Sequence, residues 1–404
     1  GRQFRFDPPM SREIGEYAKF DRFAPKAGNK YVLYGALAGL DAPGEWYHDA
    51  ETQTLYLKTP DGDAPAVHIV EAKRRDWAFN LASKHFIHIE GITVFAAAVD
   101  LDEAQACRVE NCRVLYPNHA EVSDGRNTDL PTNRMGGSEN VWRRCEIAYA
   151  AGGALEDYGT ANRVENCIIH DIDHLGTGRG GIGTRASRSV YERNTIYNGG
   201  RILINHKDAK GIRIVYNHLY NAGLLTQDCG VTKTGWCDGQ GTEIAYNWVH
   251  DNKAKVGEGI YLDDFCKGFV IHHNVAWSNA GAGIRLNGPC EDTRVYNNTV
   301  LDNRWSFNTF THQGYDPDQS TVQVINNLCD GEMIFSTDRF APEAHHNGDF
   351  DLGKDFVPLE GSGAIDSGIA IAGFTDGFIG QAPDVGAYER GAPVWIPGAD
   401  WSVP

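Results

Sequence analysis

The sequence lacks long apolar stretches, an excess of basic charge and any helical period. No apolar run approaches the ~20 residues that a membrane span needs, so we expect no membrane partner. The chain has 37 Lys and Arg against 54 Asp and Glu, a net charge of −17. Because nucleic-acid binding needs clustered Lys and Arg, this balance argues against nucleic acid. It also weighs against a strongly anionic polysaccharide, unless a local basic patch or a metal intervenes.

Cysteine pairs with metal-site spacing are also missing. None of the nine cysteines stands in a CxxC pair or a Cys/His cluster, so we expect no zinc site. An odd number leaves at least one thiol unpaired unless it bonds between chains. The number suits an exported protein, and we expect a secreted or periplasmic location. The chain starts at Gly1 without a signal-like segment, from which we expect a mature or truncated start.

What the sequence does have is a repeat. A glycine-led run around Ile260 is followed by a β-rich run that ends at Asn274, and a near copy around Ile284 ends at Asn298. In both copies the interval from isoleucine to asparagine is 14 residues. Copies at regular spacing indicate a repeat architecture. Aligning the chain on this asparagine gives ten corner positions: Gly91, Cys112, Cys145, Cys167, Asn194, Asn217, Asn247, Asn274, Asn298 and Asn327.

Short strands at even spacing with Asn at one corner predict an all-β fold. Asn tolerates the left-handed backbone of a tight corner, and stacked Asn side chains can hydrogen-bond along the stack. We therefore predict a right-handed parallel β-helix with three strands per coil and about ten coils. Residues 1–65 are predicted as an N-terminal cap with a β-hairpin, 66–330 as the β-helix, and 331–404 as a C-terminal cap and tail.

A column of mainly aromatic residues follows the corners. The residues three positions beyond successive corners are His170, Tyr197, Tyr220, His250, Trp277 and Leu301. Membership of this column favours packing over metal binding for its two histidines.

The chain resembles the pectate-lyase-like right-handed β-helix proteins that act on polysaccharides. The resemblance is carried by the glycine-led strands, the Asn corners, the Gly-Glu-Trp-Tyr segment at 44–47 with Leu55-Tyr56-Leu57, and the ending at 384–389. It implies a polysaccharide or oligosaccharide substrate and a groove on the glycine-led strands. It also implies that coils are missing upstream. Because that superfamily contains both glycoside hydrolases and polysaccharide lyases, both activities stay open. We expect a monomer.

The cysteines divide into three sets. Cys112, Cys145 and Cys167 occupy consecutive corners, where disulfides and stacked free thiols are both open. Cys266 and Cys290 fall in adjacent coils, and we predict a disulfide between them. Cys229 and Cys237 bracket an eight-residue excursion that a bridge would also close.

Candidate site residues come from the glycine-led strands and from two long steps between corners, 117–138 and 217–247. If Ile260 and Leu262 point into the coil, strand alternation places their neighbours outward. The predicted outward residues are Arg185, Asn205, Tyr261, Asp263, Arg285 and Asn287, and the strand exits add His206, Lys207 and Asp264. The second long step adds Asp228, Lys233, Trp236 and Asp238, because long loops on a regular scaffold commonly bind ligands.

Three functions fit these residues. The first is a secreted glycoside hydrolase, in which Asp263 and Asp228 supply the two carboxyl groups, Asp264 and Asp238 stand in reserve, and neither metal nor cofactor is needed. The sugar contacts would then come from Arg185, Asn205, His206, Lys207, Lys233, Trp236, Tyr261, Arg285 and Asn287. The second is a polysaccharide lyase, in which His206, Lys207 or Lys233 removes a proton from a uronate and Ca²⁺ is held by the Asp cluster. The third is a non-catalytic carbohydrate-binding β-helix.

Purely structural roles also fit these residues. Asp263 and Asp264 would then cap a turn, Asp228 would be a turn residue, and His206 and Lys207 would be solvated strand ends.

Overall fold

The computed structural model describes residues 35–119, 131–311, 321–331, 333–334 and 342–403. Half of the predicted 117–138 loop, residues 120–130, lies outside these ranges. The chain divides into two compact units, Gly1–Glu71 and Ala72–Pro404. In the first unit, β1 (Trp46–Asp49) and β2 (Thr54–Leu57) form the predicted antiparallel hairpin, accompanied by the 3₁₀ turns η3 (Leu37–Gly39) and η4 (Pro65–Val67). Whether this unit caps the β-helix stays a prediction.

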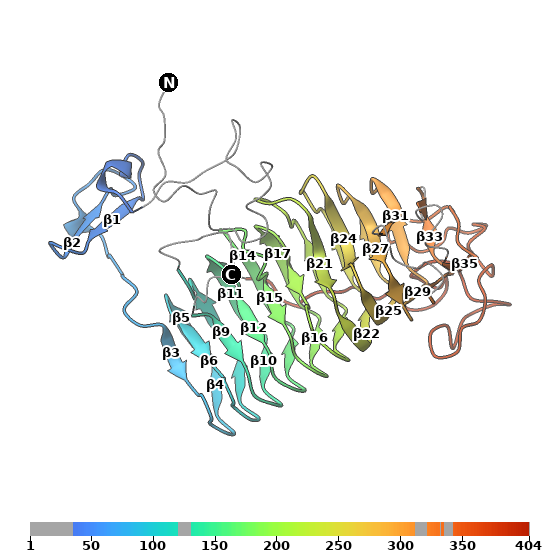
Figure 1. Ribbon diagram of the computed structural model, residues 1–404, viewed down its shortest axis with the longest axis horizontal. Helices are drawn as coiled ribbons and strands as arrows, with labels where there is room; N and C mark the ends of the chain where they lie inside the picture. The colour runs from blue at the N-terminus through green and yellow to red at the C-terminus, as the bar shows by residue number, and fades with distance from the viewer. Residues whose placement is uncertain (1–34, 120–130, 312–320, 332, 335–341, 404) are drawn as a thin grey trace. The chain divides into compact units, whose positions relative to one another are not determined.

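The second unit is a parallel β-helix in which each coil adds one strand to each of three sheets (Figure 1). The first sheet consists of β3 (Trp77–Asn80), β6 (Ala98–Asp100), β9 (Asn133–Met135), β12 (Leu155–Asp157), β15 (Ile182–Thr184), β18 (Ile204–Asn205), β21 (Cys229–Gly235), β24 (Gly257–Asp263), β27 (Ala282–Gly288), β31 (Trp305–Thr311) and β34 (Met333–Ile334). These are the glycine-led strands of the sequence, and the predicted fold class is confirmed.

The other two sheets follow on either side of the Asn corner. The second sheet consists of β4 (His88–Glu90), β7 (Arg108–Glu110), β10 (Val141–Arg143), β13 (Arg163–Glu165), β16 (Val190–Glu192), β19 (Arg213–Val215), β22 (Asp238–Ala245), β25 (Cys266–His272), β28 (Cys290–Glu291), β29 (Arg294–Tyr296), β32 (Gln323–Ile325) and β35 (Glu343–His345). The third sheet consists of β5 (Thr93–Phe95), β8 (Arg113–Leu115), β11 (Glu146–Ala150), β14 (Ile168–Ile172), β17 (Thr195–Gly199), β20 (His218–Tyr220), β23 (Trp248–His250), β26 (Val275–Trp277), β30 (Thr299–Leu301) and β33 (Leu328–Cys329).

The predicted Asn corner forms a buried hydrogen-bonded column. The Oδ1 atom of Asn274 accepts the backbone N–H of Asn247 at 3.1 Å and its Nδ2 at 2.9 Å. The same Nδ2 of Asn247 also donates to the carbonyl of Ile214 at 2.8 Å. Each Asn side chain therefore satisfies buried backbone hydrogen-bonding groups at the corner of the preceding coil, which explains why one residue type recurs there.

The cysteines correct the sequence prediction. All nine are buried free thiols, so the predicted Cys266–Cys290 disulfide is not formed, although the two residues are register partners in adjacent coils. Their thiols donate instead to the backbone carbonyls of Asp263 and Asn287, at 3.1 and 3.0 Å. Cys229 begins β21 and Cys237 lies two residues beyond its end, and the two do not pair.

The C-terminal tail runs back along the outside of the coils. The indole of Trp248 donates to the Tyr388 hydroxyl at 3.1 Å, and further along the tail the Trp401 indole donates to the carbonyl of Asn166 at 2.8 Å. Between these points, Trp395 packs edge-on against Tyr246. The tail therefore ties together coils that lie far apart in the sequence.

Candidate functional site

The outer face of the first sheet carries a line of polar side chains, one from each coil. The strand register aligns Asn205 of β18, Lys233 of β21, Tyr261 of β24 and Arg285 of β27. The residues between them, such as Ile260, are fully buried in the coil interior. The line thus follows from strand alternation combined with an unbroken parallel register.

Asp263 is the centre of the hydrogen-bonded cluster on this face. Its Oδ1 accepts Tyr261 OH at 2.9 Å and Asn287 Nδ2 at 2.8 Å, and its Oδ2 lies 3.1 Å from the Lys233 ammonium. Burial raises the pKa of Asp263, but the charge of Lys233 and these hydrogen bonds outweigh burial and hold the pKa below its usual value. Asp263 is therefore an ionised carboxylate whose direction is fixed.

Tyr261 separates two cations. The Lys233 ammonium lies 4.4 Å from the centre of its ring, and the Arg285 guanidinium lies 5.4 Å from the same centre. Burial raises the pKa of this phenol, and the charge of Asp263 adds to the effect. Tyr261 is therefore a neutral hydrogen-bond donor, and its ring spaces Lys233 from Arg285.

A pocket of about 290 Å³ opens beside this cluster. Its charged residues are Arg201, Lys207, Lys233 and Asp263. Trp236 is 64% exposed at its rim, and its ring lies 4.1 Å from that of Phe265. Thr177, Gly178, Ile202, Asn205, Thr234 and Gly235 complete the lining.

Most of the other predicted residues lie near this pocket. Asp228 is exposed, and its carboxylate lies 3.7 Å from the Lys233 ammonium. Asn205 donates its Nδ2 to the Gly178 carbonyl at 2.7 Å, so it holds the pocket wall. Arg185 is exposed in the coil of β15, two residues beyond Gly183. Lys207 stands at the equivalent position of the next coil, two residues beyond Asn205, which is the register partner of Gly183.

Two predicted carboxylates lie toward the second sheet. Asp238 begins β22 and pairs with Lys267 at 3.4 Å. Asp264 is at the corner after β24, where its backbone carbonyl accepts the N–H of Trp236. Neither lines the pocket.

His206 has to be removed from the list of candidate bases. It follows Asn205 on the strand and points into the coil, where it is fully buried beside Phe269. Both ring nitrogens lack a hydrogen-bond partner within the described part of the chain. Burial lowers the pKa of this imidazole to about 3. The predicted position was a strand exit open to a substrate, but strand alternation continues through His206 and turns it inward.

Two charged residues of this part of the molecule were not among the predicted site residues. Arg201 lines the pocket from the turn before β18, where strand alternation gives no guide because the chain is not yet extended. Glu258 is fully buried at the start of β24 and pairs with Arg285 at 2.7 Å. The only sequence signal for Glu258 was a charged residue between two glycines of a buried strand.

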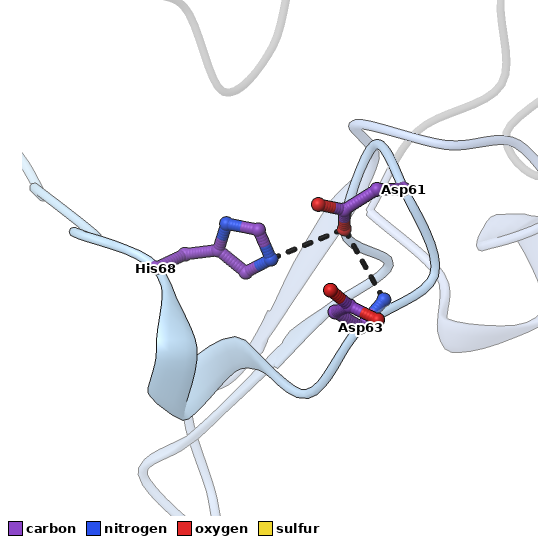
Figure 2. A group of neighbouring side chains, drawn as sticks. All are labelled: Asp61, Asp63 and His68. Atoms are coloured by element: carbon purple, nitrogen blue, oxygen red, sulfur yellow. Dashed lines mark hydrogen bonds and ion pairs between the residues drawn. The ribbon is translucent and has the colours of Figure 1, made fainter.

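A second acidic group lies in the first unit (Figure 2). His68 Nε2 lies 3.1 Å from Asp61 Oδ1, the same oxygen that accepts the backbone N–H of Asp63. The two aspartates are exposed, and their mutual geometry is that of a turn closed by an ion pair.

The β-helix region matches a known family. Residues 97–300, about half of the chain, match the model of the right handed beta helix region, so the chain belongs to this family. The resemblance drawn from the sequence is confirmed at the level of the fold.

The comparison with solved structures finds several similar chains. Pectate lyase Pel9A is 15% identical, with 76% of this chain and 88% of that chain covered and a TM-score of 0.55. The periplasmic alginate epimerase AlgG is 11% identical (66% and 77% covered, TM-score 0.36), and a glycoside hydrolase is 12% identical (78% and 58%, TM-score 0.37). No curated protein matches the sequence. None of the helices in the described part of the chain is long and apolar enough to cross a membrane.

Proposed function

We propose that this protein is an enzyme that cleaves a uronate-containing polysaccharide by β-elimination. The observation that carries the proposal is the charge of the pocket. In a chain with net charge −17, Arg201, Lys207 and Lys233 gather around a single lining carboxylate, Asp263. A cationic pocket in an acidic protein selects an anionic ligand. This is the local basic patch that the overall composition did not reveal.

Each cation has a place in such a reaction. Elimination from a uronate requires a base that removes the proton from C5, after which the C4–O bond breaks and the leaving oxygen takes up a proton. We assign removal of the C5 proton to the neutral amine form of Lys233, whose side chain is only 14% exposed and is aimed by Asp263 and Asp228. The ammonium that results is paired with these two carboxylates, and its proton passes to the leaving oxygen. Arg201 and Lys207 face the same pocket and would neutralise the uronate carboxylate.

The exposed indole of Trp236 supports a sugar ligand. Its face is large, rigid and open at the pocket rim, and Phe265 supports it from the next coil. The C–H face of a sugar ring packs well against such a surface.

The Asp cluster does not fit a calcium ion. Calcium needs about six to eight oxygen ligands, whereas the oxygens of Asp263 are bound by Lys233, Tyr261 and Asn287. Asp238 faces another sheet. The proposed reaction therefore contains no step through calcium.

Glycoside hydrolysis is the second candidate. It is favoured by one observation, the two carboxylates Asp228 and Asp263 that lie within 4 Å of the same ammonium group. Against it, the lowered pKa of Asp263 makes this residue a poor proton donor to a leaving group.

Product analysis tests the proposal. The protein would be incubated with polyuronates built from galacturonate, or from mannuronate and guluronate, and with neutral glycans of similar length. We expect unsaturated products that absorb in the ultraviolet, and only from a polyuronate. New reducing ends without that absorbance would support the hydrolase. Binding without either product would support a carbohydrate-binding protein. A polysaccharide substrate also leads us to propose a location outside the cytoplasm, which fractionation of the source cells would check.

A further inference from the structure

A buried carboxylate lies behind the pocket and does not line it. Glu258 has no exposed surface, and its Oε1 accepts Arg285 NH1 at 2.7 Å, while Oε2 accepts the backbone N–H of Ala282. Burying a charge is unfavourable unless the charge is paired and hydrogen-bonded. Stability alone would therefore be served as well by an apolar residue at this position.

Glu258 connects to the pocket through Arg285. The Arg285 Nε donates to Asn287 Oδ1 at 2.9 Å, which leaves the Asn287 amide group free to donate to Asp263 at 2.8 Å. The same amide group lies 3.0 Å from the Tyr261 hydroxyl. An unbroken chain of contacts thus runs from Glu258 through Arg285 and Asn287 to Asp263 and, at its end, to Lys233.

The orientation of Asn287 depends on this chain. An amide side chain presents an acceptor on one side and a donor on the other. With Arg285 bound to its oxygen, Asn287 can present only its NH₂ group to Asp263. If Arg285 moved away, the amide could turn over and place its oxygen against the carboxylate, which would repel it.

A second carboxylate also acts electrostatically on Arg285. The Arg285 guanidinium and the Lys233 ammonium both lie against the ring of Tyr261. The negative charges of Glu258 and Asp228 both favour the charged form of Arg285. Asp263 lies one hydrogen bond beyond Arg285, through Asn287, and is already paired with Lys233, so an Arg285 released from Glu258 would compete for it.

We propose that Glu258 and Arg285 are positioning residues, which hold Asn287 and Asp263 so that Lys233 points into the pocket. This inference rests on the proposed function for its kinetic consequences but not for its structural ones. Glu258 keeps Arg285 from competing with Lys233 for Asp263, and neither Glu258 nor Arg285 touches the substrate.

The experiment is a double-mutant cycle with Glu258→Gln and Arg285→Gln. We expect each single variant to lose about 100-fold in kcat with little change in KM, because misplacement of a reacting group by about 1 Å has a cost of this size. The double variant should be no worse than either single one, since both changes break one chain of contacts. Losses that multiply would overturn the proposal.

A second readout needs no substrate. The titration of the Asp263 carboxyl carbon is followed by NMR, with Asp263→Asn to assign the signal. We expect Glu258→Gln to lower the Asp263 midpoint by about one pH unit, because the released Arg285 turns toward it. In the Arg285→Gln background the same change should have less than half of that effect. An unchanged midpoint would overturn the proposal even if no polysaccharide is turned over, so the inference and the proposed function fail separately.

Glu146→Gln is the matched control. Glu146 is a similarly buried carboxylate paired with an arginine, Arg113, but it lies on the third sheet. We expect it to lower the melting temperature about as much as Glu258→Gln, with kcat and the Asp263 midpoint unchanged. If Glu146→Gln reduced kcat equally, the effect of Glu258 would be general destabilisation and the proposal would be wrong.

Discussion

The outer faces of the first and second sheets share the same stacked register but carry different patterns of charge. On the second sheet, charges of opposite sign pair within a strand and between neighbouring coils. Arg143 pairs with Glu110 and Glu165, and Arg163 pairs with Glu165 and Glu192. On the first sheet, Arg201, Lys207 and Lys233 accumulate around Asp263 instead. Both faces are built on the same parallel register, so the fold does not dictate the difference.

The comparison shows how to read charges on a repeating scaffold. When every charge on a face has a nearby partner of opposite sign, the charges neutralise one another and little net charge remains to attract a ligand. Exposed pairs of this kind contribute only about 0–1 kcal/mol each. A surplus of one sign, held in a pocket, is unfavourable without a ligand and therefore indicates binding.

The most direct way to break this comparison is to remove one cation from each face. We expect Lys233→Ala on the first sheet to reduce kcat on a polyuronate by about 10³-fold, the usual size of a general-base contribution. Arg163→Ala on the second sheet should stay within about twofold, since it removes only surface pairs. Steady-state kinetics measures both. Equal losses of kcat in the two variants would mean that the difference in charge between the two faces does not matter for catalysis.

The sequence predicted the scaffold better than the site. Asn194 and Asn298 mark their corners because their side chains donate buried hydrogen bonds to backbone carbonyls. The left-handed backbone that the sequence analysis assigned to the corner Asn falls instead on the residue before it, as at Arg193 and Asn297. Lys233 and Asp263 could be placed on one face by counting along extended strands. Arg201 could not, because it enters the pocket from a turn with no period.

The remaining errors have the same kind of cause. His206 continues the strand inward by one residue more than we predicted. Cys266 and Cys290 meet as predicted, but residue proximity does not specify whether thiols pair with each other or with backbone carbonyls. A sequence pattern predicts where a residue lies on a coil, whereas the direction and the hydrogen-bond partner of its side chain depend on the local geometry.

The buried Asn column at the corners provides a further comparison with the pocket, because we expect its role to be purely structural. We expect Asn247→Ala to reduce the free energy of unfolding by about 3 kcal/mol, because it leaves the Ile214 carbonyl and its column neighbours without buried partners. Ser278→Ala, which loses an exposed hydrogen bond to Asp302, should cost less than about 0.5 kcal/mol. Urea unfolding measures both. Similar values for the two variants would contradict the idea that the buried column carries the stability of the coils.

The inward and outward sides of one strand should differ in their pH dependence. The folded-state pKa of His206 is lowered to about 3, so the unfolded chain binds this proton first as the pH falls. Stability therefore decreases below the usual histidine pKa of about 6.5 and continues to decrease toward the folded value. We expect His206→Leu to remove about 2 kcal/mol of the stability lost between pH 6.5 and pH 5. The exposed neighbour serves as the control, and Lys207→Gln should leave the profile unchanged. Urea unfolding across this pH range would contradict the prediction if the wild-type and His206→Leu profiles were parallel.

The smallest effect separates sugar packing from charge within the pocket itself. Trp236 is exposed and touches none of the groups assigned to proton transfer, so its removal should weaken binding without altering the chemistry. We expect Trp236→Ala to raise KM about fivefold with kcat within twofold, in line with about 1 kcal/mol for one aromatic contact. Trp236→Phe should recover most of the affinity, because the ring face is retained. Lys207→Gln, at the charged side of the same pocket, should instead reduce the salt dependence of KM, since screening acts on charge and not on ring packing. If Trp236→Ala changed the salt dependence and Lys207→Gln did not, the pocket would select its ligand by a contact other than the charge surplus that distinguishes the first sheet from the second.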